Sequence, residues 1–286
     1  MNAFPSYVDL EFTARCNLAC GFCFGPHDDR RSADLGHEFW GNVIAEVARR
    51  GAQGIVVSGG EPTLVAGLPA LLAAAKALGL KTVVSTHGRL TSKVAKIAAH
   101  CDWIALPADA ASREGLIEMR GDAWGLPQAA ALARELKEVA PHVRIKLGSV
   151  GTRLNTRELV RLAQDLRAYD PMPFDTWKIY QYTPRRKFAS RRELYEISDA
   201  RFAALENAMR ATGVTESIYT VFSSHAARRR AYLFVYPDGT VAIPNEGESF
   251  GDLVLGNAGV DGMAVFDRVA ALLLGENTRN FEVTYG

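Results

Sequence analysis

Cysteine is scarce in this chain, and long apolar runs and an excess of one charge sign are missing. Only four of the 286 residues are cysteine, too few for the disulfide framework of a small secreted domain. No apolar stretch reaches the ~18 residues that a membrane span needs, and the first residues lack the basic start and apolar core of a signal peptide. The formal net charge of +1 gives no electrostatic case for nucleic acid or an acidic membrane surface. We expect a cytoplasmic protein that binds neither.

Short β-type runs alternate with longer helical patterns over the first three quarters of the chain. The composition, with 48% hydrophobic and 23% charged residues, is that of an ordinary globular protein, and neither repeats nor low-complexity linkers interrupt it. Apolar runs and periodicity predict strands at 8–12, 55–58, 82–85, 103–106, 143–147 and 176–180. They predict helices ending near 51 and at 68–78, 92–100, 127–139, 156–168 and 199–211, with Asn155 and Glu158 at the spacing of a capping box.

Six strand–helix units in succession predict an α/β fold with a parallel sheet. In such sheets ligands bind at the carboxyl ends of the strands. We therefore expect the segments after the six strands to form the functional surface: the cysteine loop, SGGEP, STHG, PADA, GSVGTRLN and QYTPRRK.

The pattern changes after residue 214. The segment 217–222 and the run 231–243, with its Pro-Asp-Gly turn, predict strands and a hairpin, and a last helix is expected at 261–273. We divide the chain into a main domain at 1–214 and a β-rich C-terminal extension at 215–286 packed on it.

Three of the four cysteines, Cys16, Cys20 and Cys23, lie within eight positions. In a reducing compartment such a cluster indicates a metal site or a catalytic site. A structural zinc ion needs four ligands, usually in two distant pairs, and only His27 or Cys101 could complete the set. Three thiolates on an iron–sulfur cube would instead leave one iron with an open position for a substrate or cofactor. Cys101 on its own is expected to be a small buried apolar residue.

The spacing C-x3-C-x2-C, in the loop after a first strand, resembles the radical S-adenosylmethionine (SAM) superfamily. A second motif, Gly59-Gly60-Glu61-Pro62, ends the second strand and matches the GGEP of that family. The resemblance implies a [4Fe–4S] cluster on the three cysteines, with SAM chelated to the open iron and cleaved reductively to a 5′-deoxyadenosyl radical. Glycines let a backbone approach the cofactor closely, and Glu61 can pair with the ammonium group of SAM.

Further matches to this family follow the later strands and imply more residues of the cofactor site. They place Phe22, Ser85, Asp109 and Arg120 beside the cluster and SAM, with Arg120 on the SAM carboxylate. His87 departs from the usual Asn of the S/T-N-G loop. The resemblance implies a partial (β/α)6 TIM-like barrel, with the β-rich extension after it, and an electron donor such as flavodoxin or ferredoxin.

A narrower likeness is to the viperin group, which dehydrates a nucleotide. It covers CNLACGFCF, RIKLGSVGTRLN and TWKIYQ, and it maps Asn17, Lys146 and Lys178 onto positions that face the nucleotide. Gly148 and Thr176 depart from that pattern, so two residues that would hold a triphosphate are absent. No cysteine cluster follows Cys23 and no cobalamin domain is apparent, so we expect a single cluster and no cobalamin.

Basic residues follow the sixth strand at Arg185, Arg186 and Lys187. Such runs are usually solvated, but beside Lys178 they favour an anionic substrate such as a nucleotide or sugar phosphate, with Arg185 and Arg186 at the mouth of the pocket. The alternative for Lys146 and Lys178 is an internal ion pair with a carboxylate such as Asp9, Glu11 or Asp109.

The leading hypothesis is thus a radical SAM enzyme that dehydrates, epimerises or rearranges a small, anionic molecule. One alternative is modification of a peptide or protein. Another is a non-catalytic iron–sulfur redox protein, which would explain neither GGEP nor Arg120. The residues do not identify a catalytic side chain that contacts the substrate.

Overall fold

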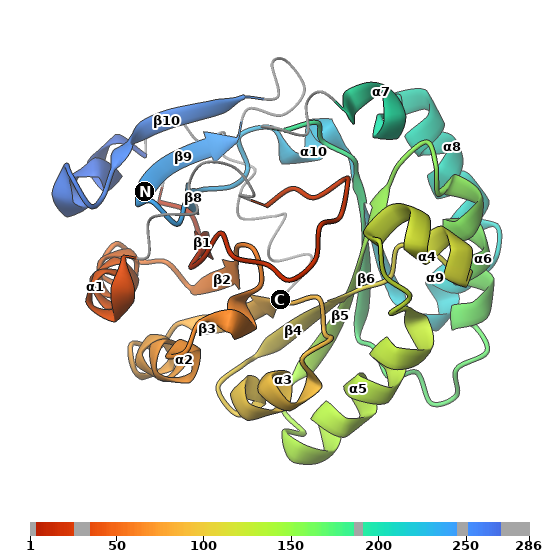
Figure 1. Cartoon of the computed structure of the whole chain (residues 1–286), viewed down its shortest axis with the longest axis horizontal. Coiled ribbons are helices and arrows are strands. Elements are labelled where there is room, and N and C mark those ends of the chain that lie inside the picture. Colours follow the sequence, from red (N-terminus) through yellow and green to blue (C-terminus); the bar gives the residue numbers. More distant parts are fainter. Residues whose placement is uncertain (1–3, 26–34, 186–190, 245–250, 270–286) are drawn as a thin grey trace.

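The structure, a computed structural model, describes residues 4–25, 35–185, 191–244 and 251–269 (Figure 1). Its strands form a ten-stranded sheet in the order β10-β9-β8-β1-β2-β3-β4-β5-β6-β7. The strands are β1 (Tyr7–Glu11), β2 (Gly54–Ser58), β3 (Lys81–Ser85), β4 (Trp103–Pro107), β5 (Arg144–Gly151), β6 (Thr176–Gln181), β7 (Tyr219–Ser223), β8 (Phe234–Val235), β9 (Thr240–Pro244) and β10 (Asp252–Asn257).

The first six strands lie side by side in sequence order, and every neighbouring pair is parallel. All six strand predictions are confirmed, and no end differs by more than four residues. The sheet curves without pairing its two outer strands, β10 and β7, in the described residues. An α/β fold with an open, partial barrel is therefore confirmed.

Helices, of which the longer ones cover the convex face of the sheet, connect the strands (Figure 1). They are α1 (Gly36–Arg49), α2 (Leu68–Ala77), α3 (Thr91–Ala98), α4 (Arg113–Arg120), α5 (Leu126–Val139), α6 (Thr156–Leu166), α7 (Arg192–Tyr195), α8 (Asp199–Arg210), α9 (Val214–Ser217) and α10 (His225–Arg228), with short 3-10 turns η2 (Pro62–Leu64) and η4 (Gly262–Arg268). The segment after β1, red in Figure 1, crosses the concave side. The concave side is therefore where the cysteine loop lies.

Alternation along β1 assigns its side chains to two environments. Val8 and Leu10 are fully buried in the main apolar core, whereas Asp9 and Glu11 face the concave side and line a cavity there. A second apolar cluster, of Tyr7, Val56, Val83 and Trp103, packs beneath this cavity near the starts of the strands. The outer face of the strands is thus apolar, whereas the inner face is apolar near the starts of the strands and polar where it lines the cavity.

The chain after residue 214 adds strands to both edges of this sheet. β7 pairs in parallel with β6, and β8 pairs in parallel with β1. The expected hairpin is confirmed as β8 and β9, with Gly239 at a φ of +83° in its turn. The last helix is a 3-10 segment, η4, in the described residues, and 270–273 lie outside them. The division at residue 214 stays a prediction.

One local expectation was wrong, and one helix was not expected. Asn155 and Glu158 do not form a capping box: Asn155 Nδ2 donates to the carbonyls of Asp109 and Val150, and Glu158 accepts from the backbone N–H of Ser112. Both side chains therefore tie the start of α6 to the neighbouring loop after β4, and Glu158 also accepts from Arg161 on its own helix. The helix α4 in that loop was not predicted, although Ser112 caps its start and Gly121, at a φ of +68°, ends it.

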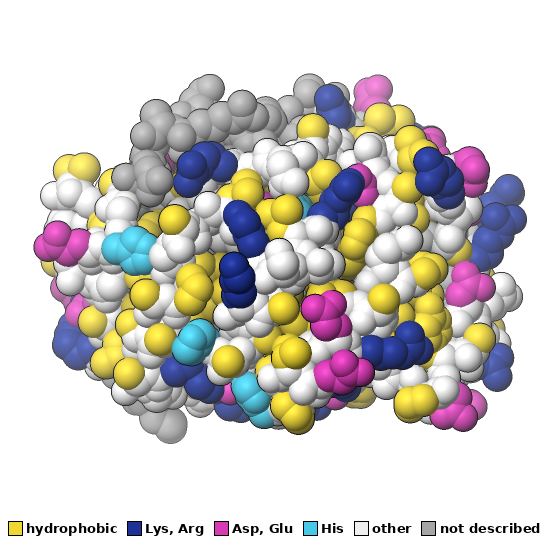
Figure 2. All heavy atoms as spheres, turned by 60° about the horizontal axis from the view of Figure 1, so that its bottom comes forward, with side chains coloured by type: hydrophobic (Ala, Val, Ile, Leu, Met, Phe, Trp, Pro, Cys, Tyr) yellow, Lys and Arg dark blue, Asp and Glu magenta, His cyan; other side chains and the backbone are white. Residues whose placement is uncertain are grey.

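Lys and Arg side chains are interspersed with Asp and Glu on the face drawn in Figure 2. This fits the near-zero net charge. Among the described helices, none combines the length and the apolar character that crossing a membrane would require.

Candidate active site

A cavity of about 370 Å³ opens at the carboxyl ends of the six central strands. Each of the six segments expected to form the functional surface contributes to its lining, which confirms that expectation. Eleven of the fourteen residues proposed from the sequence lie on it: Cys16, Cys20, Phe22, Cys23, Gly59, Gly60, Ser85, Asp109, Arg120, Lys146 and Lys178. The other three are Asn17, Glu61 and Arg185, which are not lining residues.

Backbone groups are directed at the sulfur atoms of the cysteine loop. The N–H of Leu18 donates to Cys16 Sγ and that of Gly25 to Cys23 Sγ, each at 3.4 Å. Cys20 Sγ donates to the carbonyl of Arg120 at 3.7 Å. Burial raises the pKa of all three thiols, that of Cys23 to about 12. The thiols therefore favour the protonated form at neutral pH, and a metal group would displace the protons on binding.

The Gly59-Gly60 turn packs against the segment that leads into the cysteine loop. Gly60 N donates to Thr13 O at 2.7 Å, and Glu61 N donates to Arg15 O at 2.8 Å. Gly59 has a φ of +125°, and a Cβ at Gly60 would overlap the carbonyl oxygen of Arg15. The two glycines are thus needed for close approach of two backbone segments, so the motif and the cysteine loop hold each other in place.

Glu61 is buried directly behind this turn and its carboxylate accepts four hydrogen bonds. Oε1 accepts from the N–H of Thr63 and from the hydroxyls of Thr63 and Thr86, at 3.1, 2.5 and 2.7 Å, and Oε2 accepts from His87 N at 2.9 Å. These contacts join the loops that follow β2 and β3. The side chain therefore acts here as a link between two walls of the cavity.

His87 continues this link to the cysteine loop. Its Nδ1 accepts from the N–H of Arg89, so the ring proton lies on Nε2, which donates to Asn17 Oδ1 at 2.8 Å. Burial lowers the pKa of His87, which favours this neutral form. The structure thus places Asn17, beside Cys16, against His87 rather than on the cavity wall.

Asp109 and Arg120 form an ion pair on the cavity wall that follows β4. Arg120 Nη1 lies 2.6 Å from Asp109 Oδ2, and both side chains are largely buried. Asp109 Oδ1 also accepts from the N–H of Val150. Ser85 reaches the same cavity from the end of β3.

The floor of the cavity carries charges of both signs. Lys146 and Lys178 are 3% exposed, and Lys146 Nζ lies 3.2 Å from the hydroxyl of Tyr180. Burial lowers the pKa of Lys178 to about 8. Burial raises the pKa of Tyr180, but the two lysines outweigh it, so the pKa falls below that of a free phenol. Asp9 faces this group from β1.

Arg185 is buried away from the expected mouth of the cavity. Its Nη2 donates to the hydroxyl of Tyr236 at 2.9 Å and forms an ion pair with Asp252 on β10. Its guanidinium stacks on Phe24, with 4.4 Å between Cζ and the ring centroid. Arg185 therefore connects the cysteine loop to the C-terminal strands. Arg186, Lys187 and His27 lie outside the described residues.

A family model for the Radical SAM superfamily matches residues 10–166, more than half of the chain. The chain belongs to the radical SAM superfamily. The matched residues include the cysteine loop, the glycine turn and the Asp109–Arg120 pair.

Curated relatives of this radical SAM chain carry two kinds of name. An S-adenosylmethionine-dependent nucleotide dehydratase of Flammeovirga pacifica is 30% identical over 196 residues, 65% of each chain. One of Lacinutrix mariniflava is 28% identical over 68% of this chain and 42% of its own length. A PqqA peptide cyclase of Rhodopseudomonas palustris is 39% identical over 90 residues, 31% of this chain and 24% of its own. The matches thus span less than two thirds of these relatives.

Solved structures resemble the fold. SuiB of Streptococcus suis, bound to S-adenosylmethionine, has a TM-score of 0.69 at 17% identity, covering 94% of this chain and 67% of its own. The native anSMEcpe structure with bound AdoMet has a TM-score of 0.63 at 15% identity, covering 95% and 81%. At these identities the likeness concerns the fold alone.

Radical SAM proteins use a [4Fe–4S] cluster and SAM, and the donor set of this chain fits the cluster. Three thiols from one loop line the cavity, and backbone N–H groups already point at two of them. Thiolates are the usual ligands of such clusters. Among the described residues no three Cys, His, Asp or Glu side chains converge on a site for a single metal ion. Cys101 is fully buried at the end of α3, as expected, with its Sγ donating to Ile97 O.

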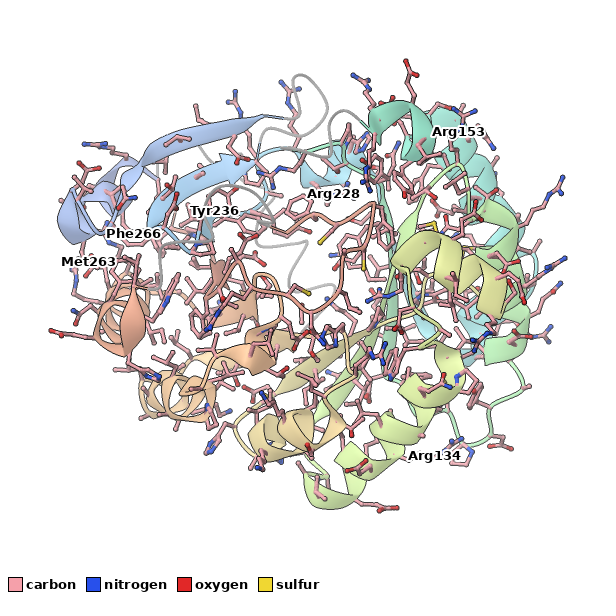
Figure 3. The ribbon with its side chains drawn as sticks, viewed as in Figure 1. Arg134, Arg153, Arg228, Tyr236, Met263 and Phe266 are labelled. Carbon is pink, nitrogen blue, oxygen red and sulfur yellow. The ribbon has the colours of Figure 1, made fainter. Side chains whose placement is uncertain are left out.

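Sequence reasoning did not find Phe24, Tyr180 or Arg228, which all line the cavity. Arg228 is buried, and its Nη2 donates to the carbonyl of Gln181 and to the hydroxyl of Thr183. Figure 3 labels Arg228 and Tyr236 on the side closed by α10, β8 and β9. Tyr180 could have been predicted, because it lies two residues after Lys178 and therefore on the same face of β6. For Arg228, in a run of three arginines, the sequence gives no such sign.

Proposed function

We propose that this chain is an enzyme that uses a [4Fe–4S] cluster and SAM to abstract hydrogen from a small, anionic molecule, nucleotide-like or sugar-phosphate-like, for dehydration, epimerisation or rearrangement. The observation that carries the proposal is that Lys146 and Lys178 line the same cavity as the three cysteines. Two buried lysines at a cavity floor suit a phosphate or carboxylate, which an ammonium group binds without strict geometry.

The cofactor side of the cavity is assigned to the loops that follow β1, β2, β3 and β4. Cys16, Cys20 and Cys23 would hold the cluster, and Phe22, Gly59, Gly60, Ser85, Asp109 and Arg120 would surround SAM. With both groups bound, the chemistry supplied is reductive cleavage of SAM to a 5′-deoxyadenosyl radical that removes a hydrogen atom from the substrate. Glu61, with four acceptor contacts to its own protein, and Asn17 would keep this wall in shape.

The substrate side is assigned to β5 and β6. Lys146 and Lys178 would hold the anionic group, with Tyr180 and Arg228 next to them. Arg185 would act at a distance, by fixing Phe24 beside Cys23. An electron donor such as flavodoxin or ferredoxin is proposed as the physiological partner. The relatives named nucleotide dehydratase support a phosphorylated substrate, and the departures at Gly148 and Thr176 leave its identity open.

The test is anaerobic reconstitution followed by comparison of Lys178→Ala with Lys96→Ala, an exposed lysine on α3. We expect about four irons per chain in both variants. We also expect both to cleave SAM slowly without substrate. Only Lys178→Ala should lose substrate-dependent turnover. A cluster that survives Cys16→Ala, or a Lys178→Ala protein with full turnover, would contradict the proposal.

Peptide modification is the second candidate, because a PqqA peptide cyclase matches a 90-residue stretch at 39% identity. The two candidates differ in what increases SAM cleavage. A small phosphorylated or carboxylated compound should do so in the first case, and only a peptide in the second. Binding of SAM to the reconstituted protein separates both from a non-catalytic redox protein.

A further inference from the structure

The side chain of Asp9 is an unexplained acid at the floor of the cavity. It is 8% exposed, it lines the cavity, and its Oδ2 has no hydrogen-bond partner among the described residues. A buried polar atom without a partner costs free energy, so native proteins rarely keep one without a use. β1 fixes the position firmly, because Val8 and Leu10 on either side are locked in the apolar core.

The groups around Asp9 come from three strands. Glu11 follows on the same face of β1, and Lys146 and Lys178 approach from β5 and β6. Burial, and then Glu11, raise the pKa of Asp9 to about 8, against the opposing effect of the two lysines. At neutral pH the group is therefore a carboxylic acid, which can both donate and accept a hydrogen bond.

We propose that Asp9 contacts the substrate by hydrogen-bonding a hydroxyl group next to the anionic group, so that the substrate is a hydroxylated molecule with one phosphate or carboxylate rather than a polyphosphate. The inference rests on the proposed function, since it takes Lys146 and Lys178 as the anion site. A hydroxyl is the natural partner of a carboxyl group in either protonation state. Further phosphates would bring negative charge toward Glu11, which lines the same cavity beside Asp9.

A structural role for Asp9, as a counter-ion of the two lysines, makes a different prediction about stability. If Asp9 mainly stabilises the fold, replacing it by an apolar residue of similar size should lower the unfolding temperature. If Asp9 instead binds the substrate, Asp9→Leu should keep or raise the unfolding temperature. The reason is that a buried acid without a partner destabilises the protein when no substrate is bound. Asp9→Asn keeps both a donor and an acceptor and should preserve the contact.

The experiment measures binding of three probes to the reconstituted holoprotein by calorimetry, at neutral pH with SAM present. Glycerol 3-phosphate and propyl phosphate have the same chain length and differ in their hydroxyl groups, and tripolyphosphate adds charge. We expect the wild type to bind glycerol 3-phosphate about five-fold more tightly than propyl phosphate, the value of one hydrogen bond. Tripolyphosphate should bind no more tightly than propyl phosphate.

The variants separate this inference from the proposed function. Asp9→Leu should bind the two monophosphates equally. Asp9→Asn, and Glu135→Gln on the exposed face of α5, should keep the preference. A preference that survives in Asp9→Leu, or tight binding of tripolyphosphate to the wild type, would overturn the inference alone. Monophosphate binding that persists in Lys178→Ala, or no binding at all, would overturn the anion site and with it the proposed function.

Discussion

Arg120 Nη1 lies 2.6 Å from Asp109 Oδ2, and this ion pair joins α4 to the loop after β4 on the wall of the cavity. The other oxygen of Asp109 accepts from the N–H of Val150 at the end of β5. One carboxylate thus fixes three segments. Both residues keep a partner before any cofactor binds.

The pair should behave as a unit in unfolding experiments. Removing one member leaves a buried charge alone, so Asp109→Ala or Arg120→Ala is expected to cost about 3–5 kcal/mol of unfolding free energy. The double variant should cost clearly less than the sum of the two. Anaerobic urea unfolding of the holoprotein measures this coupling. Strictly additive losses would show that the two charges do not depend on each other.

The glycine turn gives a second prediction, with a control in the same cavity. Gly60→Ala would push its Cβ into the carbonyl of Arg15, so loss of folded protein or of the cluster is expected, at a cost of about 2 kcal/mol or more. At Gly148 the nearest atoms to a Cβ lie at 3.9 and 4.0 Å, so Gly148→Ala should be tolerated. Expression yield and iron content compare the two. Equal behaviour would contradict the close approach.

Glu61 provides a third prediction. Glu61→Gln replaces one accepting oxygen by an NH2 group, which faces the donors of Thr63, Thr86 or His87. A loss of about 1–3 kcal/mol in unfolding free energy is therefore expected. Glu114→Gln, on the exposed face of α4, is the matched control and should change stability little. Urea unfolding checks both. If Glu61→Gln were as stable as its control, the four hydrogen bonds would not hold the loops together.

A fourth prediction concerns pH and Asp9. The folded protein keeps this proton up to a pH of about 8, whereas an unfolded chain releases it near the ordinary value of 3.8. Between these values the folded state binds more protons, so stability from this group falls as the pH rises. Asp9→Asn should therefore gain at least about 1 kcal/mol on the wild type between pH 5 and 8. Unfolding at several pH values measures the difference, and a constant difference would refute the assignment.

Local chemistry made the six central strands predictable. Runs such as 55–58 and 82–85 are short, apolar and bounded by glycine or polar residues, and the parallel order follows from the helices between them. Because ligands bind at the carboxyl ends of parallel strands, the cysteine loop and the Gly59-Gly60 turn could also be placed on the functional surface. The helix α4 was missed because its apolar residues are few, although Ser112 and Gly121 mark its ends.

Contacts between distant segments were not predictable from the sequence. Nothing near Arg185 indicates that its partner is Asp252, and nothing near Asn17 points to His87. Such pairs depend on how the loops lie after the sheet has formed. The same applies to Asn155, whose spacing with Glu158 fits a cap, but whose amide is used by the neighbouring loop instead.

The parallel pairing of β8 with β1 bears on the order in which the protein can mature. β1 ends at Glu11, whereas β8 begins at Phe234, and Phe234 and Tyr232 complete the cavity wall beside Phe24. During synthesis the cysteine loop leaves the ribosome long before this wall exists. The cavity wall beside the three thiols is therefore completed only after the segment that carries Tyr232 and Phe234 has emerged, more than 200 residues after the cysteine loop.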